Sequence, residues 1–80
     1  MNLDDLRRAL VEGGFRPDSY SLEGGLREDR ITLDEAHGRW FVYYVERGKR
    51  WEEAQFENEH SACVEFLKRI SRDSVAREQP

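Results

Sequence analysis

The sequence predicts an α+β fold in the order α-β-β-β-α, a three-stranded antiparallel meander with two helices packed on one face. Apolar residues recur at helical spacing near both ends of the chain and alternate with polar residues in its middle. Turn-forming residues separate the alternating stretches at short intervals, so consecutive strands are expected to pair antiparallel. A chain of 80 residues has room for one domain with one core.

The first helix is predicted by three leucines at helical spacing: Leu3, Leu6 and Leu10. Asn2 precedes them and is expected to be the N-cap, because its side chain can accept a hydrogen bond from the first turn. Gly13 is expected to end the helix in a left-handed conformation. Phe15 should then fold back onto the helix as the apolar partner of that cap.

The next segment, residues 16–29, is predicted to be a structured loop. It holds Pro17, Asp18, Ser19, Ser21, Gly24 and Gly25, a density of turn formers that excludes a long regular element. Residues 20–22 leave room for a short strand.

Three strands are predicted in the middle of the chain. Residues 30–36 alternate between apolar and polar side chains, and residues 40–45 are aromatic or β-branched throughout. A third strand is expected at 50–56. His37–Gly38 and Arg47–Gly48 fall between these stretches and suit tight hairpin turns, with positive φ expected at Gly48.

A second helix is predicted after Asn58, which is its expected N-cap. Its apolar positions form one stripe: Ala62, Cys63, Phe66, Leu67 and Ile70. Periodicity is lost after Ser71, so residues 1–71 are expected to form a single α+β domain and residues 72–80 a flexible C-terminal tail.

The two faces of the predicted sheet differ. If both hairpin loops have two residues, one apolar set faces the helices: Ile31, Leu33, Val42, Tyr44 and Trp51. Phe41, Tyr43 and Val45 then point the other way, where no remaining segment is expected to cover them. A change of one residue in either loop would exchange part of this assignment.

No catalytic constellation is apparent in the sequence. Cys63 lies on the apolar stripe of the second helix, where a buried small hydrophobe is expected. His60 could share a metal ion with Cys63 and Glu59, but adjacent helical residues point in different directions. His37 lies in a predicted hairpin turn, and turn formation accounts for its presence there. The chain is therefore expected to be no enzyme and to bind no metal or cofactor.

The net charge of the chain excludes some classes of binding partner. The chain has 13 Lys and Arg residues against 17 Asp and Glu, a net charge of −4, so neither nucleic acid nor an anionic membrane is expected as partner. Double-stranded-RNA-binding domains share the α-β-β-β-α order, but they need a basic start to the second helix, and here that start holds Glu59 and His60.

The longest apolar run, 40–45, is far below the ~20 residues that span a bilayer. Without signal-peptide features at the N-terminus, a cytoplasmic location is expected. A monomer is favoured, with the oligomeric state left open.

Two motifs carry a resemblance to a known family. They are Tyr20-Ser21-Leu22-Glu23-Gly24-Gly25 and Val42-Tyr43-Tyr44-Val45-Glu46-Arg47-Gly48. Together with the helix from Ser61 to Leu67, they resemble the bacterial immunity protein 59 family, over roughly residues 3–70. Its members are small cytosolic proteins encoded beside toxin genes of polymorphic or contact-dependent inhibition systems. The resemblance implies that this chain binds and neutralises a cognate toxin and has no chemistry of its own.

The residues expected to contact such a partner are of three kinds. They are the uncovered row Phe41, Tyr43 and Val45, the acidic residues Glu46, Glu52 and Glu53, and Tyr20 in the loop. The acidic residues favour a cationic toxin such as a nuclease. The alternative is a small accessory or adaptor domain with an unrelated protein partner, followed by a regulatory nucleic-acid binder.

Overall fold

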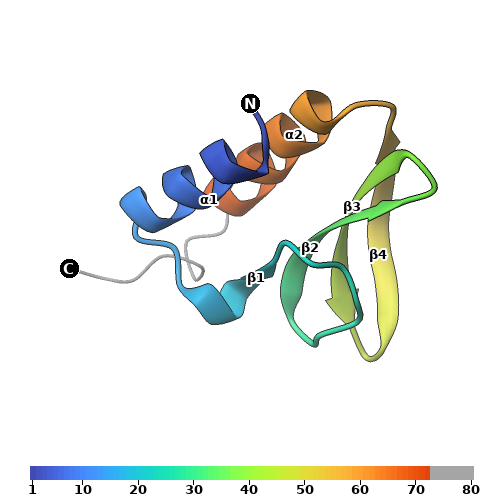
Figure 1. Cartoon of the computed structure of the whole chain (residues 1–80). Coiled ribbons are helices and arrows are strands. Elements are labelled where there is room, and N and C mark those ends of the chain that lie inside the picture. Colours follow the sequence, from blue (N-terminus) through green and yellow to red (C-terminus); the bar gives the residue numbers. More distant parts are fainter. Residues whose placement is uncertain (73–80) are drawn as a thin grey trace.

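The computed structural model describes residues 1–72 and has two helices on one side of a four-stranded sheet (Figure 1). The elements in chain order are α1 (Leu3–Glu12), the 3₁₀ turn η1 (Pro17–Ser19), β1 (Tyr20–Ser21), β2 (Arg30–Ala36), β3 (Arg39–Glu46), β4 (Lys49–Phe56) and α2 (Glu59–Arg72). The α+β class predicted from the sequence is confirmed. Residues 73–80, most of the expected tail, lie outside the described residues, and Arg72 belongs to α2.

The sheet has one strand more than the predicted three-stranded meander, and this is the short strand for which residues 20–22 left room. Its order is β1-β2-β3-β4, and β1 runs parallel to β2, with Tyr20 opposite Ile31. The other pairs are antiparallel, as expected. The sheet is therefore mixed, and the purely antiparallel three-stranded prediction was wrong in this detail. The added strand is only two residues long, too short to produce a periodic pattern.

Both hairpins have the predicted two-residue loops. His37 and Gly38 have φ values of +55° and +77°, and Arg47 and Gly48 have φ values of +55° and +71°. Two successive positive φ values define the type I′ turn, whose twist matches that of the flanking strands. The prediction of which strand residues face the helices assumed two-residue loops, and this assumption is confirmed.

The strand register confirms which side chains share a face. Ile31 lies opposite Tyr44, and Leu33 opposite Val42. This face carries the core, whose buried apolar members are Leu6, Leu10, Phe15, Ile31, Leu33, Val42, Ala62, Cys63, Phe66 and Ile70. Trp51 lies opposite Tyr44 but remains 47% exposed, because it stands on the outermost strand.

The ends of α1 follow capping rules, with one correction. The Asn2 side chain accepts from the Asp5 amide at 2.9 Å, as an N-cap should. At the other end Gly14, and not Gly13, adopts the left-handed conformation, with φ of +73° against −79°. The Phe15 amide donates to the Leu10 carbonyl, which makes the cap one residue longer than predicted. Phe15 is buried against the helix as expected.

The two helices begin side by side (Figure 1). Asn58 caps α2 through a 2.8 Å bond from the Ser61 amide. The Glu59 carboxylate, in the first turn of α2, accepts from the Leu3 amide at 2.9 Å, so one acidic side chain serves the positive ends of both helices. Neither helix of the described chain has the length and apolar character needed to cross a bilayer.

Candidate functional site

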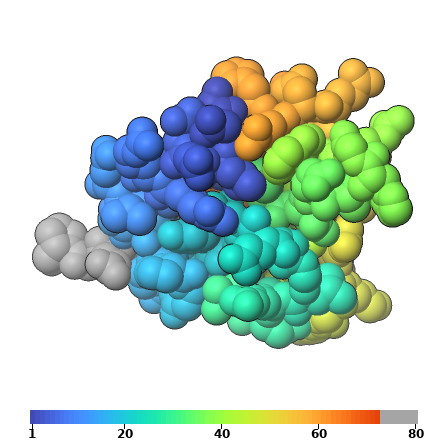
Figure 2. Space-filling view, in the orientation of Figure 1, coloured from blue at the N-terminus to red at the C-terminus, as the bar shows by residue number. Residues whose placement is uncertain are grey.

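The second face of the sheet is not the uncovered surface that the sequence predicted. Tyr43 and Val45 are both 0% exposed, and Phe41 is half-buried. The loop of residues 22–29 leaves β1 and folds across this face before the chain enters β2. In the orientation of Figure 1, this segment lies in front of the sheet beneath α1, and Figure 2 shows it as the cyan to green surface there. The proposed aromatic contact row is therefore wrong for Tyr43 and Val45.

Backbone hydrogen bonds fix the loop to the sheet at both of its ends. The Gly24 amide donates to the Leu33 carbonyl at 3.0 Å, and the Asp29 amide donates to the Val45 carbonyl at 2.8 Å. Glu28 reaches further, because its carboxylate accepts from the amides of both residues in the Arg47–Gly48 turn. The loop is thus held by β2, by β3 and by the β3–β4 turn.

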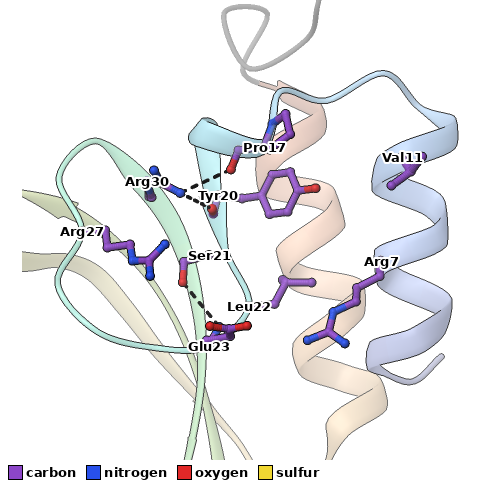
Figure 3. A pocket seen from close by; sticks show the side chains of 9 residues that line it. All are labelled: Arg7, Val11, Pro17, Tyr20, Ser21, Leu22, Glu23, Arg27 and Arg30. Atoms are coloured by element: carbon purple, nitrogen blue, oxygen red, sulfur yellow. Dashed lines mark hydrogen bonds between the residues drawn. The ribbon is translucent and has the colours of Figure 1, made fainter.

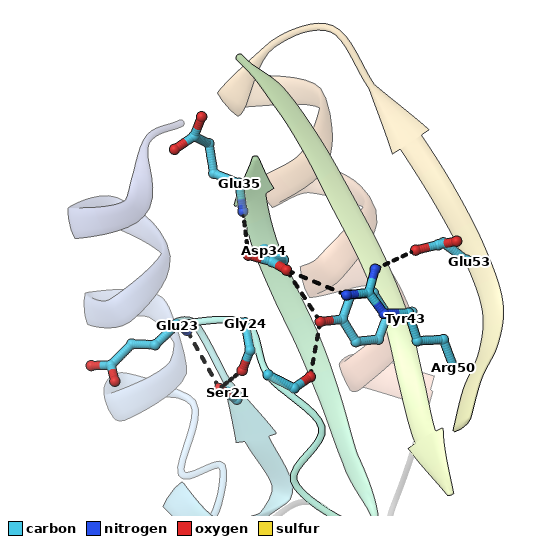
Figure 4. Close-up of polar contacts among 9 residues, drawn as sticks. Ser21, Glu23, Gly24, Asp34, Glu35, Tyr43, Arg50 and Glu53 are labelled. Atoms are coloured by element: carbon cyan, nitrogen blue, oxygen red, sulfur yellow. Dashed lines mark hydrogen bonds and ion pairs between the residues drawn. The ribbon is translucent and has the colours of Figure 1, made fainter. Parts of the chain in front are cut away.

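Tyr43 is the centre of the contacts beneath this loop (Figure 4). Its hydroxyl group donates to the Gly25 carbonyl at 2.9 Å and lies 3.4 Å from Asp34 Oδ2. The Arg50 guanidinium stacks over the ring at 4.3 Å from its centre and pairs with Glu53 at 2.8 Å. Burial raises the pKa of the Tyr43 phenol, although the nearby Arg50 acts in the opposite direction. This cluster holds the loop in place.

The remaining residues expected to bind a partner are separated by the fold. Glu46, Glu52 and Glu53 are exposed, on β3 and β4. Tyr20 is half-buried, and its ring meets Phe66 of α2 edge-on at 6.4 Å. Tyr20 therefore contributes to the core packing as well as to the surface.

The acidic candidates lie on or beside β4, the outer strand of the sheet. Five consecutive residues from Lys49 are exposed, and no strand of the described chain pairs with the outer side of β4. A bulge interrupts the ladder opposite Tyr43, where Glu52 takes a φ of +54° and its carbonyl accepts from Arg69 at 2.7 Å. Trp51 stands next to the bulge, and its Nε1 donates to the Glu46 carbonyl at 3.0 Å. We call the surface made by Glu46, Trp51 and Glu52 the β4 surface; Glu53 lies on the opposite, loop-covered face of the sheet, beside Arg50 and Tyr43.

A groove that the sequence did not predict lies between α1 and the loop (Figure 3). Its volume is about 280 Å³, and arginines from three elements line it: Arg7 of α1, Arg27 of the loop and Arg30 of β2. Arg30 is fixed by hydrogen bonds to the carbonyls of Pro17 (3.3 Å) and Tyr20 (3.1 Å). No pattern in the sequence could have found the groove, because its arginines are separated by up to 23 positions and converge only in the fold.

The groups considered for catalysis or metal binding are not arranged for either. Cys63 is fully buried, and this burial raises the pKa of its thiol, which disfavours the reactive thiolate. His60 Nδ1 lies 2.6 Å from the amino group of Met1. Among residues 1–72, no three His, Cys, Asp or Glu side chains lie close enough together to hold a metal ion.

Comparisons of the chain with known protein families, with curated proteins and with solved structures gave no match. The family resemblance of the two motifs stays a prediction.

Proposed function

We propose that this protein neutralises a cognate bacterial toxin in the cytoplasm by binding it directly, without chemistry of its own. The motif resemblance to the immunity protein 59 family supports this role. The observation that carries the proposal is the β4 surface, where Trp51 is 47% exposed beside Glu46 and Glu52, on a strand whose outer side pairs with no other strand of residues 1–72. An exposed aromatic ring that a partner desolvates is a frequent energetic centre of protein interfaces, and surrounding charges steer association.

The sign of the charge favours a cationic toxin. Glu46 and Glu52 make no ion pair among the described residues, whereas Glu53 is engaged by Arg50. Nuclease toxins are cationic because they bind phosphate, and an acidic surface can occupy their substrate site. Pairs of colicin nucleases and their immunity proteins are among the tightest complexes known, so occupancy alone suffices to block such an enzyme.

The test begins with the product of the adjacent gene. Expressed alone it should be toxic, and co-expression with this protein should restore growth and yield a stable complex. Trp51→Ala should weaken the complex at least about tenfold. Val64→Ala is the matched control, since Val64 is also exposed, at 42%, but lies on α2. Equal affinities for the two variants would reject the β4 surface.

Reversing the charge of the acidic residues on the β4 surface tests whether they steer the association with the toxin. Glu46→Lys with Glu52→Lys should slow association and reduce its dependence on salt, while dissociation changes less. Glu12→Lys, at the exposed end of α1, is the control and should leave both rates unchanged. A binding partner that is harmless when expressed alone would instead assign the adaptor role.

A further inference from the structure

We propose that the groove between α1 and the loop is a second recognition site, which binds a short acidic segment of a protein partner through Arg7 and Arg27. The inference goes beyond the proposed function, because the groove lies apart from the β4 surface and its occupant need not be a toxin. The central observation is the convergence of three guanidinium groups on one concave surface of a protein whose net charge is −4 (Figure 3).

These arginines are not used by the fold as ion-pair partners. Within residues 1–72, Arg7, Arg27 and Arg30 have no carboxylate oxygen within 4.0 Å, whereas Arg8, Arg16 and Arg69 each pair with one carboxylate and Arg50 with two. Arg7 and Arg27 are exposed and make no hydrogen bond in the described structure. The groove therefore has positive charge in excess, and Glu23 is the one acidic residue that lines it among residues 1–72.

The three guanidinium groups differ in rigidity. Arg30 donates two hydrogen bonds to backbone carbonyls and is half-buried, so it forms a fixed part of the groove. Arg7 and Arg27 stand on opposite walls and can close on a ligand from both sides (Figure 3). A planar guanidinium offers paired N–H groups that match the two oxygens of a carboxylate.

The apolar part of the groove indicates a peptide. Tyr20, Leu22 and Val11 contribute side chains to its wall, and Val11 is 73% exposed. A segment in which an aliphatic residue stands between two acidic ones would cover these side chains and present its carboxylates to the arginines. The volume of about 280 Å³ is close to the lower limit of ~300 Å³ for small-molecule sites, which suits a few side chains.

Phosphate-bearing ligands fit less well. Glu23 lines the groove, and the overall negative charge repels a polyanion such as RNA. An acidic segment divides its charge between two carboxylates, and each can meet the paired N–H groups of one guanidinium. The shared chemistry is an anion with paired oxygens, so the test includes phosphate as a separate probe.

The full ¹⁵N-labelled chain is titrated with the peptide acetyl-Asp-Leu-Glu-amide and with its uncharged twin, acetyl-Asn-Leu-Gln-amide. The acidic peptide should shift the amide signals of Tyr20, Leu22 and Glu23 and the Nε signals of Arg7 and Arg27. Arg7→Gln and Arg27→Gln should each weaken binding at least about fivefold, the loss expected for one charge-assisted contact. Both residues are exposed, so the spectra should stay dispersed.

Arg8→Gln is the matched control, since Arg8 is the neighbour of Arg7 on α1, does not line the groove and pairs with Asp5 at 3.9 Å. It should bind the acidic peptide like the natural chain. Equal binding of the uncharged peptide, an equal loss in Arg8→Gln, or tighter binding of inorganic phosphate would each overturn the proposal. All of these results are independent of whether the adjacent gene product binds the β4 surface.

Discussion

The hydroxyl group of Tyr43 donates a hydrogen bond to the carbonyl oxygen of Gly25 at 2.9 Å, across 18 positions of the sequence. This contact joins the middle strand to the loop that covers it, and it explains why an aromatic residue on the face away from the helices is fully buried. Tyr43 is therefore a structural residue of the loop-covered face, and its substitution should lower the stability of the domain directly, whereas any effect on binding should be indirect.

Tyr43→Phe should lower the free energy of unfolding by about 1 kcal/mol, because the Gly25 carbonyl loses its side-chain donor while the ring packing is kept. Tyr43→Ala should cost ~3–5 kcal/mol. Urea unfolding of the three proteins measures both effects. Tyr20→Phe is the control, since the Tyr20 hydroxyl makes no hydrogen bond within residues 1–72, and it should change stability by less than ~0.5 kcal/mol. Identical losses for both phenylalanine variants would contradict the role of the Gly25 contact.

Stability should decrease at alkaline pH. Burial raises the pKa of Tyr43 in the folded state above its ordinary value of 10.0, so the folded state holds this proton more tightly than the unfolded chain. The contribution is fully present below pH 10.0 and is lost as the pH rises from there through the folded-state pKa. Urea unfolding at a series of pH values should show this decline, and Tyr43→Phe should show less of it. Burial also raises the pKa of Cys63, so this thiol contributes to the decline in both proteins. The difference in the decline between the natural chain and Tyr43→Phe gives the contribution of Tyr43.

Gly24→Ala should be more destabilising than Gly25→Ala. Both glycines have positive φ, +71° and +88°, so alanine is strained by ~1 kcal/mol or more at either position. Only at Gly24 would the added Cβ also approach Asp34 Oδ1, to 2.5 Å, whereas the space beside Gly25 is open. Unfolding free energies of the two variants measure the difference. If Gly25→Ala is equally or more damaging, the loop does not pack on Asp34 as described.

The thiol of Cys63 should be inert in the folded protein. The side chain is 0% exposed, and burial raises the pKa of the thiol, with the Glu59 carboxylate adding to the effect. A disulfide reagent such as dithionitrobenzoate should therefore react only as fast as the domain opens, and quickly in urea. A fast reaction in native buffer at neutral pH, at a rate that does not increase with urea, would show that the thiol is accessible.

The parts of this fold that the sequence predicted are those with local causes. The two hairpin turns depend on neighbouring residues, His37–Gly38 and Arg47–Gly48, and the strand register then determines which side chains face the helices. Asn2 and Asn58 cap helices through bonds to residues three positions away. The predicted left-handed residue at the end of α1 was wrong by one position, because either of two adjacent glycines, Gly13 or Gly14, can adopt a positive φ.

The parts that it did not predict depend on contacts distant in sequence. The path of the loop 22–29 is set by bonds to β2 and β3, for which an aperiodic segment gives no signal. The bulge at Glu52 has no glycine to mark it, since a glutamate takes the positive φ. Of the candidate contact residues, the three acidic ones are exposed, but Glu53 lies on another face than Glu46 and Glu52. Tyr43 and Val45 point away from the helices as predicted, but they are buried, because the loop that covers them was not foreseen.

The order of the helices along residues 1–72 has a consequence for synthesis. α1 is made before the sheet and α2, and the apolar side chains of Leu6 and Leu10 are buried in the core that α2 completes. Until α2 has emerged, these leucines have no complete core to enter, and the sheet lacks its helical cover. The domain should therefore fold as one unit only once α2 is available to cover these leucines.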